Sequence, residues 1–471
     1  MKKLLVAGLM VVLASPAFAA IQNVKVSGDI TSTYVNRDNF DLGTTLISEG
    51  VVTAGDTVPV GLKKQGVFVT QARLRVDADL SDNVSTTVGL INERGWTAET
   101  GTGGNQDTNV QLYLASVTMR ELLYSPLTVT VGRQVFNYGN GLIMGDGGVN
   151  NLATGNLANV AQDLTLRTSY DGVKAILDYK PLTIDMFYFK NSQALLNGNA
   201  ISKNSSSNVY GINANYQLND PMNTVVESYM FSRINGNDIT GTTITDKSDT
   251  LFVPGLRAST NPIKGLNVQA EIAKQLGDHP VVLTGGKQAG EHRNAMAAQL
   301  LASYSLPVLD KYKPSVNGSY TYVSGDRNTI TPYRATYTAW DPFNEIQGSG
   351  TIYNTLFPLS NMHIASVGAS ANPLEDVTTA FTWNGLWAAD DFSASNPLAL
   401  YQPDGGTTQI TPATKRNKRG LGNEYDVNLT YNYTEDVTFG VSLGWFVPGS
   451  AFSSNNNNTA SQALADVGVK F

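Results

Sequence analysis

The chain has no cysteine among its 471 residues. This absence excludes disulfide bridges, cysteine-ligated metals, a thiol nucleophile and the acceptor thiol of a lipoprotein anchor. Histidine is almost as scarce: His279, His292 and His363 are the three present, and none stands in a spacing such as His-x-x-x-His. We therefore predict no catalytic residues, no metal site and no other cofactor.

Long apolar runs are also missing after the first 14 residues. Two lysines, Lys2 and Lys3, precede the apolar run Leu4 to Leu13, and Ala17-Phe18-Ala19 follows Ser15-Pro16. A basic start, a short apolar stretch and small residues at its end are typical of a secretory signal peptide. A membrane anchor is the alternative, but it needs about 20 apolar residues. We predict a signal peptide over residues 1–19 and a single mature domain over residues 20–471.

Positive charge is in the minority. The formal net charge is −7, and loss of Lys2 and Lys3 with the signal peptide makes it −7 − 2 = −9. An acidic chain is a poor partner for nucleic acid, so we predict no nucleic-acid binding. The overall charge leaves the sign of the field inside a barrel open, because loops and lumen can differ.

What the chain has in abundance is period-two alternation in segments of about ten residues. In the segment from 68 to 80, Phe68, Leu74 and Val76 fall on one face, and Arg73 and Asp77 fall on the other. A strand with one lipid face and one wet face produces this pattern. A soluble β-sandwich alternates as well, but it rarely places large aromatic residues at so many strand ends.

Eighteen such segments are present, an even number as in bacterial single-chain barrels. Short connections alternate with long ones, which is typical of short periplasmic turns and long extracellular loops. We therefore predict an all-β fold, a transmembrane antiparallel β-barrel of about 18 strands in the outer membrane of a Gram-negative bacterium. The expected strands are 24–36, 66–79, 83–93, 108–120, 126–136, 168–180, 182–190, 208–218, 223–233, 250–259, 264–275, 292–306, 313–323, 362–372, 375–387, 418–433, 437–447 and 462–471.

The last predicted strand ends in Phe471. A terminal phenylalanine on an alternating strand looks like the signal that the barrel assembly machinery reads. The expected partners are therefore outer-membrane lipid, the assembly machinery through Phe471, and the solute that crosses the pore.

Several motifs resemble one family of barrels. They are Gly132-Arg133-Gln134-Val135-Phe136-Asn137-Tyr138-Gly139, Tyr170-Asp171-Gly172-Val173, Tyr322-Val323-Ser324-Gly325-Asp326 and Gly422-Asn423-Glu424-Tyr425-Asp426-Val427. In order and spacing these stretches resemble the alginate-export family of outer-membrane porins. The resemblance implies an 18-stranded barrel and a passive channel for hydrophilic solutes or polysaccharide. The alternatives are a surface adhesin or structural barrel and, third, an outer-membrane hydrolase.

Alternation predicts which charged side chains line the pore. The candidates are Arg73, Arg75, Asp77, Arg133, Lys174, Arg257, Glu424 and Asp426. Inward arginines either attract anionic solutes or brace acidic neighbours, and the sequence leaves both open. Acidic residues at Asp79, Glu227 and Glu271 share the inward parity, whereas alginate-passing members have an arginine-rich lumen, so the mixture argues against a polyanionic cargo.

Two features stay open. Arg133 shares parity with Val131, so strict alternation points it at lipid, whereas a bulge at Gly132 and the family resemblance point it inward. The connection 137–167 either folds into the pore or covers the outside. Asp146 and Asp163 in it suggest calcium only weakly, because no calcium-loop spacing is present, and we favour a solvated loop.

Overall fold

A computed structural model of the chain describes most of the residues after 22. The described ranges are 23–43, 64–96, 110–145, 161–193, 206–235, 239–240, 243–244, 248–282, 288–326, 336–346, 349–392, 398–401, 412–415 and 417–471. The predicted signal peptide lies outside them and stays a prediction. Within the described ranges, no helix has the length and apolar character needed to cross a membrane.

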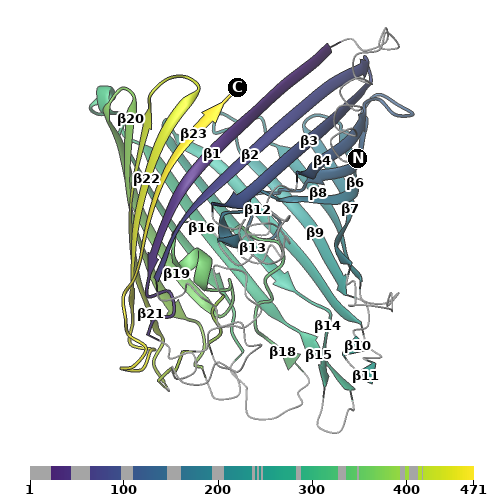
Figure 1. Cartoon of the computed structure of the whole chain (residues 1–471). Helices are drawn as coiled ribbons and strands as arrows, with labels where there is room; N and C mark the ends of the chain where they lie inside the picture. Colours follow the sequence, from purple (N-terminus) through teal and green to yellow (C-terminus); the bar gives the residue numbers. More distant parts are fainter. Residues whose placement is uncertain are drawn as a thin grey trace, which may run out of the picture.

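Eighteen antiparallel strands form one sheet that closes on itself (Figure 1). Closure is visible at β1, which pairs with its sequence neighbour β2 on one side and with the last strand, β23, on the other. The strands are β1 (Asn23–Asp38), β2 (Lys64–Ser81), β3 (Val84–Gly95), β4 (Gln111–Met119), β5 (Leu127–Val135), β6 (Ser169–Asp178), β7 (Leu182–Gln193), β8 (Ser206–Gln217), β9 (Val225–Asn235), β12 (Asp249–Ile263), β13 (Leu266–Gln275), β16 (Ala295–Ser305), β17 (Ser315–Val323), β19 (Met362–Leu374), β20 (Val377–Ala388), β21 (Gly420–Asn432), β22 (Val437–Pro448) and β23 (Ala460–Lys470).

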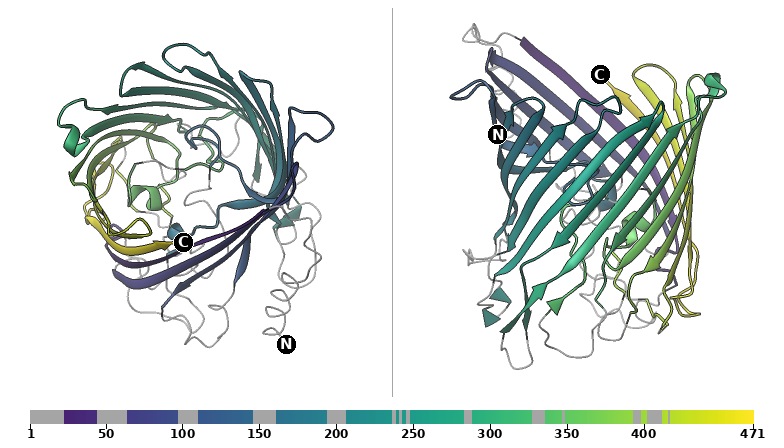
Figure 2. Two further views of the ribbon diagram at one scale, coloured as in Figure 1. Left: turned by 90° about the horizontal axis from the view of Figure 1, so that it is seen from above. Right: turned by 180° about the vertical axis from the view of Figure 1, so that it is seen from behind.

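Each of these strands overlaps one of the eighteen predicted from the sequence, so the predicted architecture is confirmed. The short connections gather at one end of the barrel and the long ones at the other, and β23 ends at the short-turn end (Figures 1 and 2). In a closed barrel every strand finds two neighbours, and no backbone edge is left facing lipid.

Alternation places the side chains as the sequence predicts. On β2, Leu74 faces outward and is exposed, whereas Gln71 faces inward and is buried. The outward face of the barrel carries many exposed apolar side chains, among them Val26, Ile212 and Leu256. This apolar outer surface suits hydrocarbon, and the polar inner surface suits a wet or protein-filled lumen.

Several small elements escaped the sequence analysis. Two lie in the long connections: the hairpin β10–β11 (Ile239–Thr240 and Thr243–Ile244) and the sheet formed by β14 (Asp278–Val282), β15 (Gln288–Arg293) and β18 (Thr336–Tyr337). The short helices are η4 (Gln162–Leu164), η5 (Asp310–Tyr312) and α2 (Tyr353–Leu356). None is long enough to show a hydrophobic period in sequence.

Phe471 completes the seam where the barrel closes. Its backbone N–H donates to the Gly28 carbonyl at 3.0 Å and its carbonyl accepts from the Gly28 N–H at 2.8 Å. A Cβ at position 28 would lie 2.6 Å from the Phe471 ring, so the ring covers this glycine. The terminal residue is thus part of the strand pairing between β1 and β23.

We expect deletion of Phe471 to reduce the amount of folded, heat-modifiable barrel in the membrane, because it removes two backbone hydrogen bonds and a ring from the seam. The measurement is gel mobility of boiled and unboiled membrane fractions. Phe471→Tyr keeps both features and serves as the control. Equal assembly of the deletion and of Phe471→Tyr would contradict the expectation.

Candidate channel lumen

Segments of two connections turn back into the barrel instead of staying outside. Segments 138–145 and 161–168 belong to the connection between β5 and β6, and the described parts of 336–361 (336–346 and 349–361) belong to the connection between β17 and β19 (Figure 2). The first and third meet inside: the Asn344 N–H donates to Ile143 O at 3.0 Å, and the Ile346 N–H donates to Gly141 O at 2.7 Å. Where it is described, the connection 137–167 therefore folds into the lumen, which resolves a question that the sequence left open.

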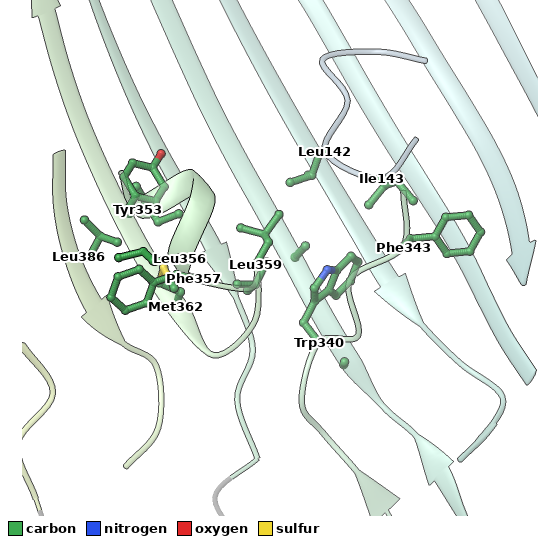
Figure 3. Packing of buried hydrophobic residues seen from close by; sticks show 14 of the residues in the cluster. Leu142, Ile143, Trp340, Phe343, Tyr353, Leu356, Phe357, Leu359, Met362 and Leu386 are labelled. Atoms are coloured by element: carbon green, nitrogen blue, oxygen red, sulfur yellow. The ribbon is translucent and has the colours of Figure 1, made fainter. Parts of the chain in front are cut away.

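Apolar side chains hold these segments against the inner wall (Figure 3). Leu142 and Ile143 come from one segment, and Trp340, Phe343 and Leu356 come from the other, and all are buried in one cluster. Burial of each large side chain contributes roughly 1.5–3 kcal/mol. The described inward segments consequently occupy part of the outer lumen and narrow the path for solute.

Glu424 fastens α2 to the wall. Its carboxylate accepts from three successive backbone N–H groups, those of Thr351 (2.6 Å), Ile352 (2.8 Å) and Tyr353 (2.6 Å). Asp426, two residues along β21, accepts from the Thr351 hydroxyl at 2.7 Å. Unpaired N–H groups at the start of a helix attract a carboxylate, so this arrangement is favourable both as hydrogen bonding and as electrostatics.

Glu424 and Asp426 thus face inward, as alternation predicts, but neither lines the pore. Both are almost completely buried under segment 349–357. Their assignment as pore-lining residues was wrong, because the sequence does not show that a distant loop covers this part of the wall.

Arg257 belongs to a second covered group. Its guanidinium is paired with Glu227 and donates to Gln269 Oε1 at 2.6 Å and to Asn140 Oδ1 at 3.3 Å. Nearby, the Tyr229 hydroxyl donates to Glu271 Oε1 at 2.6 Å. Arg257 faces the lumen but is buried beneath segment 138–145, so it braces the loop and the wall and is not open to solute.

Glu93 and Arg37 hold segment 161–168. Glu93 accepts from the Thr165 hydroxyl at 2.8 Å and from the Leu166 N–H at 2.7 Å. Arg37, almost fully buried, pairs with Asp163 at 2.5 Å. Asp163 is therefore an ion-pair partner rather than a calcium ligand. Asp146 lies outside the described residues, among which no cluster of three metal-binding side chains occurs.

An ion-pair cluster anchors segment 336–346 near the outer rim. Asp341 pairs with Arg233 at 2.8 Å and with Arg293 at 2.9 Å. Burial alone would raise the pKa of Asp341, but the two guanidinium groups hold it below its ordinary value. Glu345, four residues on, is buried as well, and burial raises its pKa to about 7 despite the nearby Arg233.

One group of charged side chains that remains open to the lumen lies on β1 and β2. Arg73 donates to Asp29 at 2.9 and 3.2 Å, and Arg75 donates to Asp77 at 2.7 and 2.9 Å. These four side chains keep 18–47% of their surface exposed. Each of these two arginines is thus neutralised by a neighbouring aspartate.

Lys174 also faces inward, on β6. Its ammonium lies 5.7 Å from the centre of the Phe136 ring, a distance suited to a cation–π contact. Lys174 therefore lies at the edge of the apolar cluster, between the buried Phe136 ring and the lumen.

Arg133 lies on the outer face of the barrel, so its assignment to the pore was wrong. Its neighbours at the same parity, Val131 and Val135, are exposed on the lipid side, and the pairing of β5 with β6 runs without a shift past Gly132. Gly132 has φ +120° and approaches the neighbouring strand closely, but no residue is inserted there, so alternation is kept. Arg133 pairs with Asp171 at 2.6 Å.

A cavity of about 400 Å³ lies between the inward segments and the inner wall of the barrel. Strands β13, β16, β17, β19 and β20 supply its wall, and Leu142, Ile346, Ser349, Tyr353 and Leu359 of the inward segments supply its inner boundary. Its polar lining consists of amides and hydroxyls, among them Gln269, Gln299, Asn317, Ser319, Thr321 and Ser366. No charged side chain is among its described lining residues.

The cavity and the inward course of segment 336–346 were not predicted from the sequence, and inward folding of the connection 137–167 was one of two alternatives. The inward parity of Gln299, Asn317 and Thr321 was readable from the strands, but the loops that turn part of the wall into a bounded cavity carry no periodic signal.

Comparisons with known proteins agree with this architecture. The family model described as Alginate export matches residues 24–466. The OpdK structure of Pseudomonas aeruginosa crystallised with vanillate is 11% identical, with a TM-score of 0.57 over 96% of this chain and 100% of that one. OccAB1 of Acinetobacter baumannii is 12% identical, with a TM-score of 0.54 over 96% and 98%. At this identity the structures show a common fold. No curated protein sequence matches the chain.

We expect Glu424→Ala to raise single-channel conductance, because three backbone N–H groups of segment 351–353 lose their acceptor at a cost of about 1–3 kcal/mol each. The measurement is conductance in planar bilayers. Asp466→Asn, an inward substitution on β23 away from α2, is the matched control. Equal conductance of Glu424→Ala and wild type would contradict an anchoring role.

Docking of segment 336–346 should weaken as pH rises. The folded state raises the pKa of Glu345 from an ordinary value of 4.5 to about 7, so docking is most favourable below 4.5 and loses stability between about 4.5 and 7. We divide the rate of protease cleavage at Trp340 in wild type by the rate in Glu345→Gln at the same pH. We expect this ratio to be about tenfold higher at pH 8 than at pH 5. Mass spectrometry of the fragments gives the rates. A constant ratio between the two proteins across pH would show that Glu345 does not control docking.

Proposed function

The chain belongs to the alginate-export family of outer-membrane porins, and from that premise we propose that it is a narrow diffusion channel for small, uncharged hydrophilic solutes of the carbohydrate class. Family membership and the closed 18-stranded barrel make the chain an outer-membrane channel protein. The choice of cargo rests on the residues that line the open part of the lumen.

The observation that carries the proposal is the cavity walled by Gln299, Asn317 and Thr321. Amide and hydroxyl groups donate and accept hydrogen bonds at once, which is what the hydroxyl groups of a sugar require. A charged wall would instead favour ions of one sign. The apolar rim supplied by Leu142 and Leu359 suits the apolar faces of a sugar ring.

The charged part of the wall supports the same choice. Because Arg73 is paired with Asp29, and Arg75 with Asp77, the pore-lining arginines brace the wall more than they attract anions. A polyanion would need unpaired cations along its path to replace its hydration. The segments inside the outer lumen also favour a short solute over a long polymer.

We further propose that the barrel has no catalytic activity. Ser442 does stand in a Gly-x-Ser-x-Gly spacing, between Gly440 and Gly444, which the sequence analysis overlooked. That motif works as a nucleophile on a sharp strand-to-helix turn, whereas Ser442 lies in the middle of β22, paired with strands on both sides.

The three histidines support the same view, since their side chains contact different residues, although His279 and His292 lie on the paired strands β14 and β15. His292 contacts Asp278, His279 stacks on Tyr337, and His363 contacts Tyr320 on the outer face. An adhesin or structural barrel is the remaining alternative. It predicts no solute flux, so a transport assay separates it from a channel.

We expect proteoliposomes containing the barrel to swell in a neutral disaccharide several-fold faster than in an oligouronate of similar size. Asn317→Leu removes an amide from the cavity wall and should lower the swelling rate in disaccharide while leaving KCl conductance within about twofold. Val316→Leu, its outward neighbour, is the matched control. Faster swelling in the oligouronate, or no swelling at all, would overturn the proposed cargo.

A further inference from the structure

A row of charged side chains crosses the lipid-facing surface on β5, β6 and β7. Arg133 is directly opposite Asp171, and Asp171 is directly opposite Lys190. The next strand continues the row with Asn208. All four have the outward parity of Val173, Met186 and Tyr210, which are exposed.

Within this row the two cations outnumber the single acid. Arg133 donates two hydrogen bonds to the Asp171 carboxylate, at 2.6 and 2.9 Å, and a third to the Leu112 carbonyl at 2.9 Å. The carboxylate still keeps 63% of its side-chain surface exposed and the guanidinium keeps 39%. Lys190 is exposed beside them, which leaves the row with a net charge of +1 on a face that is otherwise apolar.

An apolar groove of about 750 Å³ begins in the next row towards the periplasm. Register places Val173, Tyr188 and Tyr210 side by side one row below the charges, and Ala175, Met186 and Ile212 in the row below that. All six line the groove. The Tyr188 and Tyr210 rings lie 5.0 Å apart, and the Tyr188 hydroxyl donates to Asn208 in the charged row at 3.0 Å.

The charged row lies towards the outer edge of the apolar band. Lys190 is eight residues from Leu182, where β7 leaves the periplasmic turn, and Arg133 is six residues from the start of β5 at Leu127. At about 3.3 Å per residue and a tilt of about 40°, these side chains attach roughly 15–20 Å from the periplasmic ends of their strands. Long cationic side chains reach further, to the level of the headgroups.

We propose that this surface binds the phosphorylated glycolipid of the outer leaflet, with a phosphate on Arg133 and Lys190 and an acyl chain in the groove below. Arginine and lysine at headgroup depth recognise lipid phosphates, and an apolar groove open to the membrane suits an acyl chain. The cations at the outer end of the groove favour a lipid whose anionic head lies in the outer leaflet. Asp171 orients the guanidinium, and its single charge leaves the site cationic.

The test is lipid retention by the purified barrel, measured by native mass spectrometry with a bisphosphorylated outer-leaflet glycolipid, its dephosphorylated form and phosphatidylglycerol. Lys190→Gln removes one cation, and Arg133→Gln/Asp171→Asn removes the ion pair without changing the net charge. Ala175→Phe fills the groove. The matched control is Lys264→Gln/Lys313→Gln, which removes two exposed lysines from periplasmic turns. Heat-modifiability shows that each variant is folded.

We expect Lys190→Gln and Arg133→Gln/Asp171→Asn each to weaken retention of the bisphosphorylated glycolipid by about tenfold, and Ala175→Phe to weaken both glycolipid forms. The control should bind like wild type. Three outcomes would overturn the proposal: equal retention by the variants and the control, equal retention of the dephosphorylated form by wild type, or equal retention of phosphatidylglycerol. Each can occur whether or not the channel passes sugars.

Discussion

The hydrogen-bonding requirement of the backbone governs this structure. In hydrocarbon an N–H or carbonyl without a partner costs several kcal/mol, so a strand that crosses the membrane needs neighbours on both sides. The pairing of β1 with β2 and with β23 supplies the last of these neighbours, and Phe471 extends it to the final residue of the chain. Once the sheet is closed, two-residue alternation fixes which side chains meet lipid and which meet the lumen.

The same requirement explains the acidic residues of the inner wall. A loop that enters the barrel brings backbone N–H groups that have left water, and they need acceptors. Glu424 and Glu93 provide them, each accepting from backbone N–H groups of an inward segment. Carboxylates that a parity argument assigns to solute thus serve the protein itself. The part of the lumen wall that these loops leave open carries the Arg73–Asp29 and Arg75–Asp77 pairs and the amides and hydroxyls of the cavity.

How much the sequence could predict depends on the range of the interaction. The eighteen strands were predictable because alternation is local, and so were the inward positions of Arg73, Arg75, Asp77 and Lys174. The burial of Glu424 was not, since it depends on residues 351–353, about 70 positions away. For Arg133 the local pattern was right and was set aside. Alternation alone predicted its outward position, whereas the family resemblance favoured the pore.

The joining of the two inward segments has a consequence for the order in which the molecule assembles. Segment 138–145 emerges early in the chain, yet its partners Asn344 and Ile346 follow some 200 residues later, and the Glu424 that holds α2 comes later still. Contacts so distant in sequence form slowly, because the chain between them must first be arranged. The two inward segments can therefore join only once the strands between them in the chain, β6 to β17, are present. The narrowing of the lumen thus depends on residues from nearly the whole length of the wall.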